Sequence, residues 1–60
     1  MNKQAIGSNI QKFRCFNRIK QDAFAKELGV SRVMLSRYEN GRSSISLSQL
    51  ENIAAKLRLE

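Results

Sequence analysis

The segment from Ser31 to Tyr38 carries the side chains best suited to molecular recognition in this sequence. We expect it to form a helix in which Leu35 and Tyr38 face the protein interior. Its exposed face then presents four side chains, namely Arg32, Val33, Ser36 and Arg37. An arginine can donate two hydrogen bonds to O6 and N7 of guanine, and a valine methyl group can contact the methyl group of thymine. These residues are therefore candidates for contacting DNA bases, although on an isolated helix solvated surface charge is the simpler interpretation of both arginines.

The net charge favours a polyanionic partner. Eleven Lys and Arg residues against five Asp and Glu residues give a formal charge of +6, and the pI is near 10.3. Charge of this sign indicates nucleic acid first and an anionic membrane surface second. The membrane alternative is weaker, because the basic residues are spread along the chain and no predicted helix has a Lys/Arg face opposite a Trp/Phe/Leu face.

The residue types give little support to catalysis, metal binding or a disulfide. The sequence contains no histidine, which is the commonest general base and metal ligand. Its single cysteine, Cys15, can form neither an internal disulfide nor a cysteine-based zinc site, and a packing or surface role is expected for it. No nucleophile and base occur at a plausible spacing. We therefore expect a protein that is not an enzyme and that binds no metal or cofactor.

The length of 60 residues limits the chain to one domain, residues 1–60, because so short a chain can bury only one small core. No apolar run exceeds three residues. Neither a membrane-spanning helix nor a signal peptide is therefore expected. These observations predict a cytoplasmic protein.

Helical periodicity and capping signals predict four short helices, so the expected fold class is all-α. Their expected ranges are 3–16, 21–28, 31–39 and 46–57. Gly29 is expected to end the second helix in the left-handed conformation, and Ser31 is a good N-cap for the third. The dipeptide Asn40-Gly41 closes the third helix. A capping box of the S-x-x-Q type, starting at Ser46, opens the fourth.

The second and third helices are joined so tightly that they must cross steeply, which is helix-turn-helix geometry. The small side chain of Ala25 is expected where these two helices come closest. The apolar positions that this unit must bury are Phe24, Leu28, Val30, Leu35 and Tyr38. The expected apolar face of the fourth helix comprises Leu47, Leu50, Ile53, Ala54 and Leu57.

From Ile6 to Leu59 the sequence resembles the phage-repressor and Cro type of helix-turn-helix domain, also called the Xre family. The matching pieces are IGSNIQKFR, QDAFAKELGVSRVMLSRYENG and SLSQLENIAAKL. The most specific features are the ENG tripeptide after the third helix, the glutamine at the head of the second helix, and the Ala-Gly spacing between them. The resemblance implies a compact four-helix domain, with a fifth helix in longer members.

The resemblance also implies that the third helix enters the major groove of double-stranded DNA. Arg32, Val33, Ser36 and Arg37 match the base-contacting positions of the family, and in this context base contact becomes the preferred interpretation of the two arginines. The residues expected at DNA phosphates are Gln21, Lys20, Asn40, Arg42 and Ser43, with Ser44 as a further candidate. Gln21 is also expected to brace Arg32.

Two further properties follow from the resemblance. Arg14 and Glu39 are expected to form a partly buried ion pair. The protein is expected to be a bacterial or phage-encoded repressor that binds a palindromic operator as a weak homodimer formed mainly on DNA. Its self-contact is expected at residues 56–60 or 42–45, with Leu59 and Ile45 as the main apolar candidates.

Three positions depart from the family pattern. Lys20 replaces the usual N-cap of the second helix, which predicts a poor cap, and Arg18 replaces a common glycine, which leaves the shape of the first loop open. Phe16 replaces a polar residue. We expect it to be either an additional core residue, which is the preferred alternative, or part of an exposed patch covered by a partner chain.

Two classes of function compete. The leading hypothesis is a sequence-specific DNA-binding transcriptional regulator, most simply a repressor. The alternative is an interaction module of the antitoxin type, whose main partner is a toxin protein and whose DNA binding is autoregulatory. We expect the regulator, because the sequence shows no tail after Glu60 that could wrap a toxin.

Overall fold

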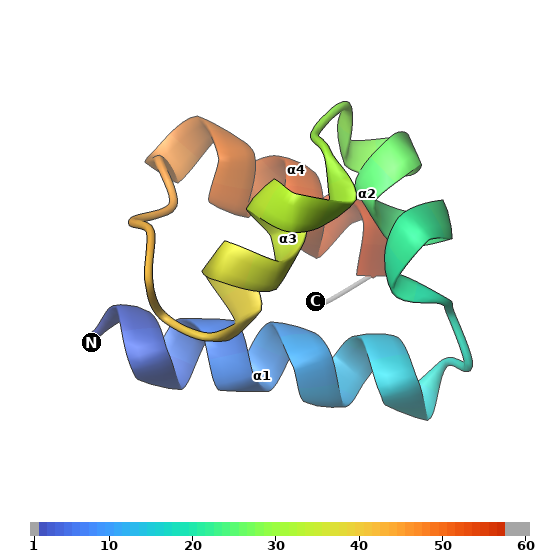
Figure 1. Ribbon diagram of the computed structural model, residues 1–60, viewed down its shortest axis with the longest axis horizontal. Coiled ribbons are helices and arrows are strands. Elements are labelled where there is room, and N and C mark those ends of the chain that lie inside the picture. Colours follow the sequence, from blue (N-terminus) through green and yellow to red (C-terminus); the bar gives the residue numbers. More distant parts are fainter. Residues whose placement is uncertain (1, 58–60) are drawn as a thin grey trace.

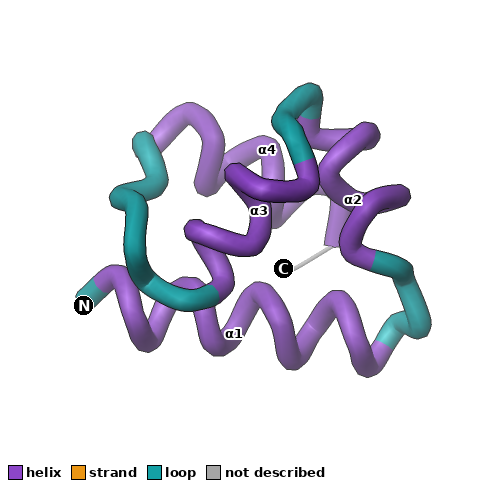
Figure 2. Tube along the Cα trace, in the orientation of Figure 1, coloured by secondary structure: helices purple, strands orange, loops and turns teal. Residues whose placement is uncertain are grey.

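The computed structural model describes residues 2–57, with only the backbone of Leu57 included. Its four helices are α1 (Lys3–Phe16), α2 (Gln21–Leu28), α3 (Arg32–Glu39) and α4 (Leu47–Leu57). They enclose one core in a body of 26 × 24 × 20 Å (Figures 1 and 2). The described residues contain no strand, and the predicted all-α fold is confirmed.

The helix starts agree closely with the capping signals. Ser31 Oγ accepts a hydrogen bond from the Met34 backbone N at 3.0 Å, and Ser46 Oγ accepts one from the Gln49 backbone N at 3.1 Å. Because these serines are caps rather than helical residues, α3 and α4 begin one residue later than predicted. Lys20 makes no side-chain capping bond to α2, as its residue type predicts.

The first three helices end in the same hydrogen-bonding pattern, the Schellman motif. Its long bond joins the backbone N to the backbone O five residues earlier: Ile19 to Arg14 at 3.0 Å, Val30 to Ala25 at 3.0 Å, and Arg42 to Arg37 at 2.8 Å. The left-handed residue of each motif has positive φ: 59° at Arg18, 74° at Gly29 and 70° at Gly41. Arg18 thus adopts the conformation that glycine favours, so the first loop keeps its shape without a glycine.

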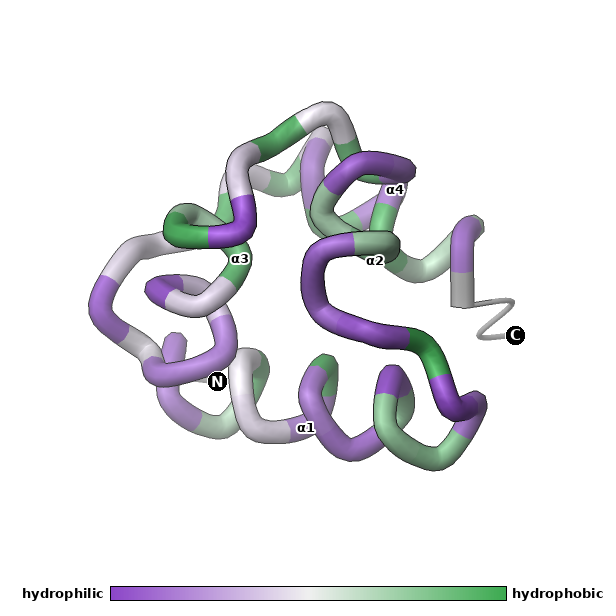
Figure 3. Tube along the Cα trace, turned by 45° about the vertical axis from the view of Figure 1, so that its right-hand side comes forward, coloured by the Kyte–Doolittle hydropathy of each residue, from purple (hydrophilic) through white to green (hydrophobic). Residues whose placement is uncertain are grey.

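Phe24, Leu35 and Ile53 form the centre of the core and are at most 1% exposed. Ile10, Ala25 and Leu28 complete it. Hydrophobic and hydrophilic residues recur in turn along the helices, as expected for helices with one buried face (Figure 3).

Two apolar residues lie outside this core. Phe16 is 84% exposed, so the prediction that it adds to the core is wrong. Its position on the last turn of α1 leaves it beyond the packed part of the helix. Leu47 is 72% exposed, and its assignment to the buried face of α4 is also wrong, because the helix begins there before reaching the core. The side chain of Leu57 and all of Leu59 lie outside the described residues.

The closest approach between α1 and α3 occurs at Gly7. A Cβ atom at this position would overlap the carbonyl oxygen of Tyr38 and would lie 2.9 Å from that of Glu39. The backbone of α3 therefore packs directly on α1 at a point where no side chain fits. This contact fixes the position of the C-terminal half of α3.

Candidate nucleic-acid interface

The exposed face of α3 is the central feature of the candidate interface. Leu35 is fully buried beneath it, and Arg32, Val33 and Arg37 are exposed, with Val33 at 65%. Ser36 is half-buried beside them. The structure therefore brings the four predicted base-contacting side chains to one helix, without placing any of them in the core. Two guanidinium groups and one aliphatic group remain available to a ligand.

The loop after α3 folds back against the helix and contacts Arg37. Arg37 Nε donates a hydrogen bond to Ser43 Oγ at 2.8 Å. Gly41 provides the turn that makes this possible, because its left-handed conformation reverses the chain. Sequence reasoning assigns Arg37 to a base and Ser43 to a phosphate, whereas the structure also connects the two residues directly.

The side chain of Asn40 is turned toward its own helix. Its Nδ2 donates to the Ser36 carbonyl oxygen at 2.8 Å and approaches Ser36 Oγ at 3.3 Å. The same carbonyl oxygen also accepts a hydrogen bond from the Asn40 backbone N at 3.0 Å. The amide donor of Asn40, expected at a phosphate, is thus used within the protein.

Arg14 and Glu39 form a bidentate ion pair between α1 and α3. Arg14 Nε lies 2.7 Å from Glu39 Oε2 and Nη2 lies 3.1 Å from Oε1. The side chains are only 10% and 2% exposed. Arg14 Nη1 also donates to the Ile19 carbonyl oxygen at 2.7 Å. The hydrogen bond to Glu39 raises the pKa of Arg14 above its ordinary value and outweighs the opposing effect of burial.

The head of α2 joins the same network. Gln21 Nε2 donates to Glu39 Oε1 at 3.0 Å. The prediction that Gln21 braces Arg32 is not what the structure shows, because its amide donor is directed at the carboxylate of Glu39. Nothing in the local sequence signals this contact, since the two residues are far apart in the chain.

Two other residues expected at phosphates have exposed side chains. Lys20 lies just before α2, and Arg42 lies in the loop after α3.

The basic side chains on the surface outnumber the acidic ones. Among the described residues the exposed basic side chains are those of Lys3, Lys12, Arg18, Lys20, Lys26, Arg32, Arg37, Arg42 and Lys56. The exposed acidic ones are Asp22, Glu27 and Glu51. The ion pair of Arg14 and Glu39 contributes no net charge. The net positive charge of the described residues is therefore carried on the surface, where it can attract a polyanion.

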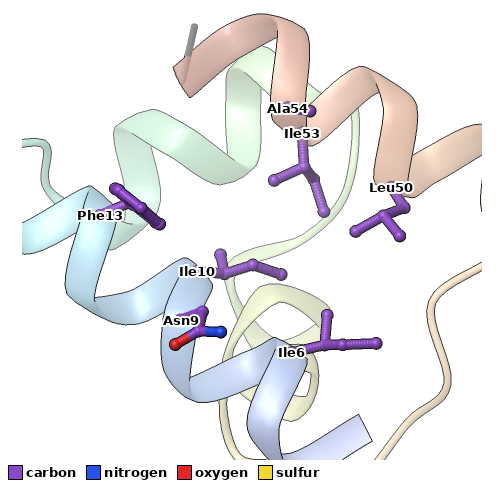
Figure 4. A pocket seen from close by; sticks show the side chains of 7 residues that line it. All are labelled: Ile6, Asn9, Ile10, Phe13, Leu50, Ile53 and Ala54. Atoms are coloured by element: carbon purple, nitrogen blue, oxygen red, sulfur yellow. The ribbon is translucent and has the colours of Figure 1, made fainter. Parts of the chain in front are cut away.

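A second surface feature is an apolar groove of about 240 Å³ between α1 and α4. Figure 4 shows Ile6, Ile10 and Phe13 of α1 facing Leu50 and Ile53 of α4 across it. Asn9 is the one polar residue of its lining. Such walls offer no cation to a phosphate, which distinguishes the groove from the candidate nucleic-acid interface.

Two findings concern metal sites and membrane-spanning helices. Across residues 2–57 no group of three or more His, Cys, Asp or Glu side chains is placed to hold a metal ion. No helix in the same part of the chain is long and apolar enough to cross a membrane.

Comparison with known proteins supports a DNA-binding role for this architecture. A family model described as helix-turn-helix matches residues 10–60. The curated protein Antitoxin PezA of Streptococcus pneumoniae serotype 4 is 43% identical over 54 residues, which cover 90% of this chain and 34% of that relative. The chain thus spans about a third of the length of this curated relative. No solved structure gives a significant match.

Proposed function

We propose that this chain represses transcription by binding an operator through the exposed face of α3. The chain belongs to the Cro/C1-type helix-turn-helix family and is a DNA-binding regulator. The observation that carries the proposal is the family match over residues 10–60, together with the exposure of Arg32 and Arg37 on α3, the recognition helix of this architecture. In this family geometry the helix lies in the major groove, where base pairs are distinguished most fully.

The roles of the side chains on α3 follow from their chemistry. Arg32 and Arg37 would donate to guanine, and Val33 would contact a thymine methyl group. Ser36, half-buried on the same helix, would donate to or accept from a base edge at short range. Because each arginine contact discriminates against the wrong base by about 1–3 kcal/mol, these residues would set the sequence preference.

Phosphate contacts would come from both sides of α3. Lys20 and the exposed start of α2 lie on one side, and Arg42 lies in the loop on the other. The N-terminus of α2 adds its unpaired backbone N–H groups, which attract anions. Such contacts would position the protein on the duplex without recognising its sequence.

The assembly proposed on DNA is a two-fold dimer. One recognition helix contacts too few base pairs to select one operator among the competing sites of a genome. Two copies on half-sites about 34 Å apart would double the sequence that is recognised. Ile45, in the loop before α4, is half-buried and remains the candidate for self-contact among the described residues. Because this leaves little apolar surface, the dimer would form mainly on DNA.

Selection of bound sequences from a random duplex pool tests the proposal. The expected result is a palindromic consensus with half-sites one helical turn apart, and binding that saturates at two protomers per duplex.

Arg37→Ala should then lose about 1–3 kcal/mol of specific binding and relax the preference at one base pair. Arg42→Ala is the matched control, because loss of a phosphate contact should weaken all duplexes alike and lower the salt slope by about one unit. Equal losses on operator and random DNA for Arg37→Ala would contradict the assignment.

A second candidate function is favoured by one observation, the similarity to a protein named as an antitoxin. In this alternative the chain would be the DNA-binding part of an antitoxin, with a toxin protein as main partner and autoregulation as the purpose of DNA binding. A gel-shift titration against random duplex, with and without added salt, tests the DNA binding that both candidate functions require. Salt-sensitive retention of the duplex supports DNA binding, and its absence would favour a module that binds only protein.

A further inference from the structure

The hydrogen bond between Arg37 and Ser43 joins a helix to the loop that follows it. Arg37 is exposed at the end of α3, and its Nε donates to Ser43 Oγ at 2.8 Å. Ser43 is half-buried, whereas its neighbour Ser44 is exposed. An arginine on a helix surface ordinarily samples many rotamers. Here one nitrogen of the guanidinium group has a defined partner before any ligand is present.

The backbone, and not Arg37, determines where Ser43 lies. The Arg42 backbone N donates to the Arg37 carbonyl oxygen at 2.8 Å. Gly41 takes a φ of 70°, and a Cβ atom there would approach the Cα atom of Gln4 to 2.8 Å. The turn is therefore packed against α1 and held by a Schellman motif. Ser43 is the fixed member of the pair, and Arg37 is the side chain that it orients.

We propose that Ser43 is a specificity-determining positioning residue, which acts on DNA sequence preference through Arg37. This inference rests on the proposed function. With Nε bonded to Ser43, the two terminal nitrogens, Nη1 and Nη2, are left to donate end-on to O6 and N7 of one guanine. The hydroxyl group thus selects a guanidinium orientation suited to bidentate base contact.

This role differs from a phosphate contact in what it changes. A serine that only donates to a phosphate contributes equally to every duplex. A serine that orients Arg37 contributes only where Arg37 meets its preferred base. The two roles are separated by the ratio of affinities for the operator and for an operator altered at one base pair.

The experiment uses the 60-residue chain and the selected operator, with a second duplex altered at the base pair where Arg37→Ala loses its preference. Ser43→Ala should lower the affinity ratio for the two duplexes about fivefold and leave the affinity for random duplex unchanged. Ser43→Thr, which keeps the hydroxyl group, should restore the ratio. Ser44→Ala is the matched control in the same loop and should leave the affinity ratio unchanged, because loss of a phosphate contact would weaken both duplexes alike.

A double-mutant cycle adds a test of the mechanism. If Ser43 acts through Arg37, Ser43→Ala should lower the ratio no further once Arg37→Ala is present, because the two side chains act as a unit. Additive losses would overturn the proposal. Equal weakening of operator and random duplex by Ser43→Ala would overturn it as well and would make Ser43 a phosphate contact.

A measurement without DNA distinguishes failure of this inference from failure of the proposed function. In NMR spectra of the free protein, the Nε–H proton of Arg37 should exchange with water several-fold more slowly than that of Arg32. Ser43→Ala should remove the difference, and Ser44→Ala should leave it. Equal exchange rates at both arginines in the unaltered protein would overturn the positioning role, whatever DNA the protein binds. Absence of any preferred operator would instead refute the proposed function.

Discussion

Removing either partner of the Arg14–Glu39 ion pair should destabilise the fold by about 3–5 kcal/mol, because the remaining charge is left buried without a counter-ion. Arg14→Met and Glu39→Gln are the two changes. The structure supports the upper part of the range for Glu39→Gln, since the carboxylate accepts two hydrogen bonds from Arg14 and one from Gln21 and its side chain is 2% exposed. Arg14 would then keep its contact with the Ile19 carbonyl but lose its charge partner.

This loss is large relative to the total free energy of unfolding of the protein. Native stability of about 0.05–0.15 kcal/mol per residue gives about 3–9 kcal/mol for a chain of 60 residues. Each single variant is therefore expected to lose a large share of this stability. The double variant Arg14→Met/Glu39→Leu removes both charges, so it should be more stable than either single variant. It still leaves Gln21 and the Ile19 carbonyl without partners, which costs about 1–3 kcal/mol for each group that stays buried.

Urea unfolding followed by circular dichroism measures these differences. With a slope near 1 kcal/mol/M for so small a domain, a loss of about 3 kcal/mol shifts the midpoint by about 3 M. Lys12→Met is the matched control, because Lys12 is exposed on the same helix, and it should shift the midpoint very little. Losses below about 0.5 kcal/mol for Glu39→Gln would refute the reasoning, since that value is typical of exposed pairs. So would a double variant that is no more stable than the single variants.

Two further predictions concern the backbone, and thermal melts check both. Arg18→Gly should stabilise the protein by about 1 kcal/mol, because it relieves the left-handed conformation of a residue with a Cβ atom. Gly29→Ala should destabilise the protein by a similar amount, since a Cβ there meets nothing within 4 Å and only its φ of 74° is unfavourable. An unchanged melting temperature in both the Arg18 and the Gly29 variant would contradict this account. Gly7→Ala should cost about 3 kcal/mol or more, because its Cβ would collide with carbonyl oxygens of α3 that cannot rotate away. Gln11→Ala, exposed on the same helix, is its control, and equal melts for the two variants would show that α1 and α3 can move apart.

The features that local sequence determines were predicted well. The four helices, the N-cap serines and the left-handed Gly29 depend on residues within one helical turn of each other. Arg18 shows the limit of this approach. Its residue type argues against a left-handed conformation, but the bonds from Ile19 and Arg18 back to α1 close the same motif that glycine closes elsewhere in the chain.

Features that depend on distant segments were missed or misjudged. Gly7 has no local signal beyond a weak helix propensity, because its requirement arises from the carbonyl groups of α3. Phe16 and Leu47 fit the apolar periodicity, but each lies at the end of a helix that extends past its packing partners. The contact of Gln21 with Glu39 joins the start of α2 to the end of α3, and only the fold brings these positions together.

That contact also bears on how the proposed interface works. The start of α2 would contact phosphates, and α3 would contact bases. Phosphate contacts fix the register of a protein on DNA, whereas base contacts recognise its sequence. The two kinds of contact act together only if the helices keep a constant relative position. Glu39 accepts hydrogen bonds from both Gln21 and Arg14, so one carboxylate connects α2, α3 and α1. Under the proposed function the buried network would therefore do more than stabilise the fold, because it would hold the start of α2, where phosphate contacts are proposed, in a constant position relative to α3.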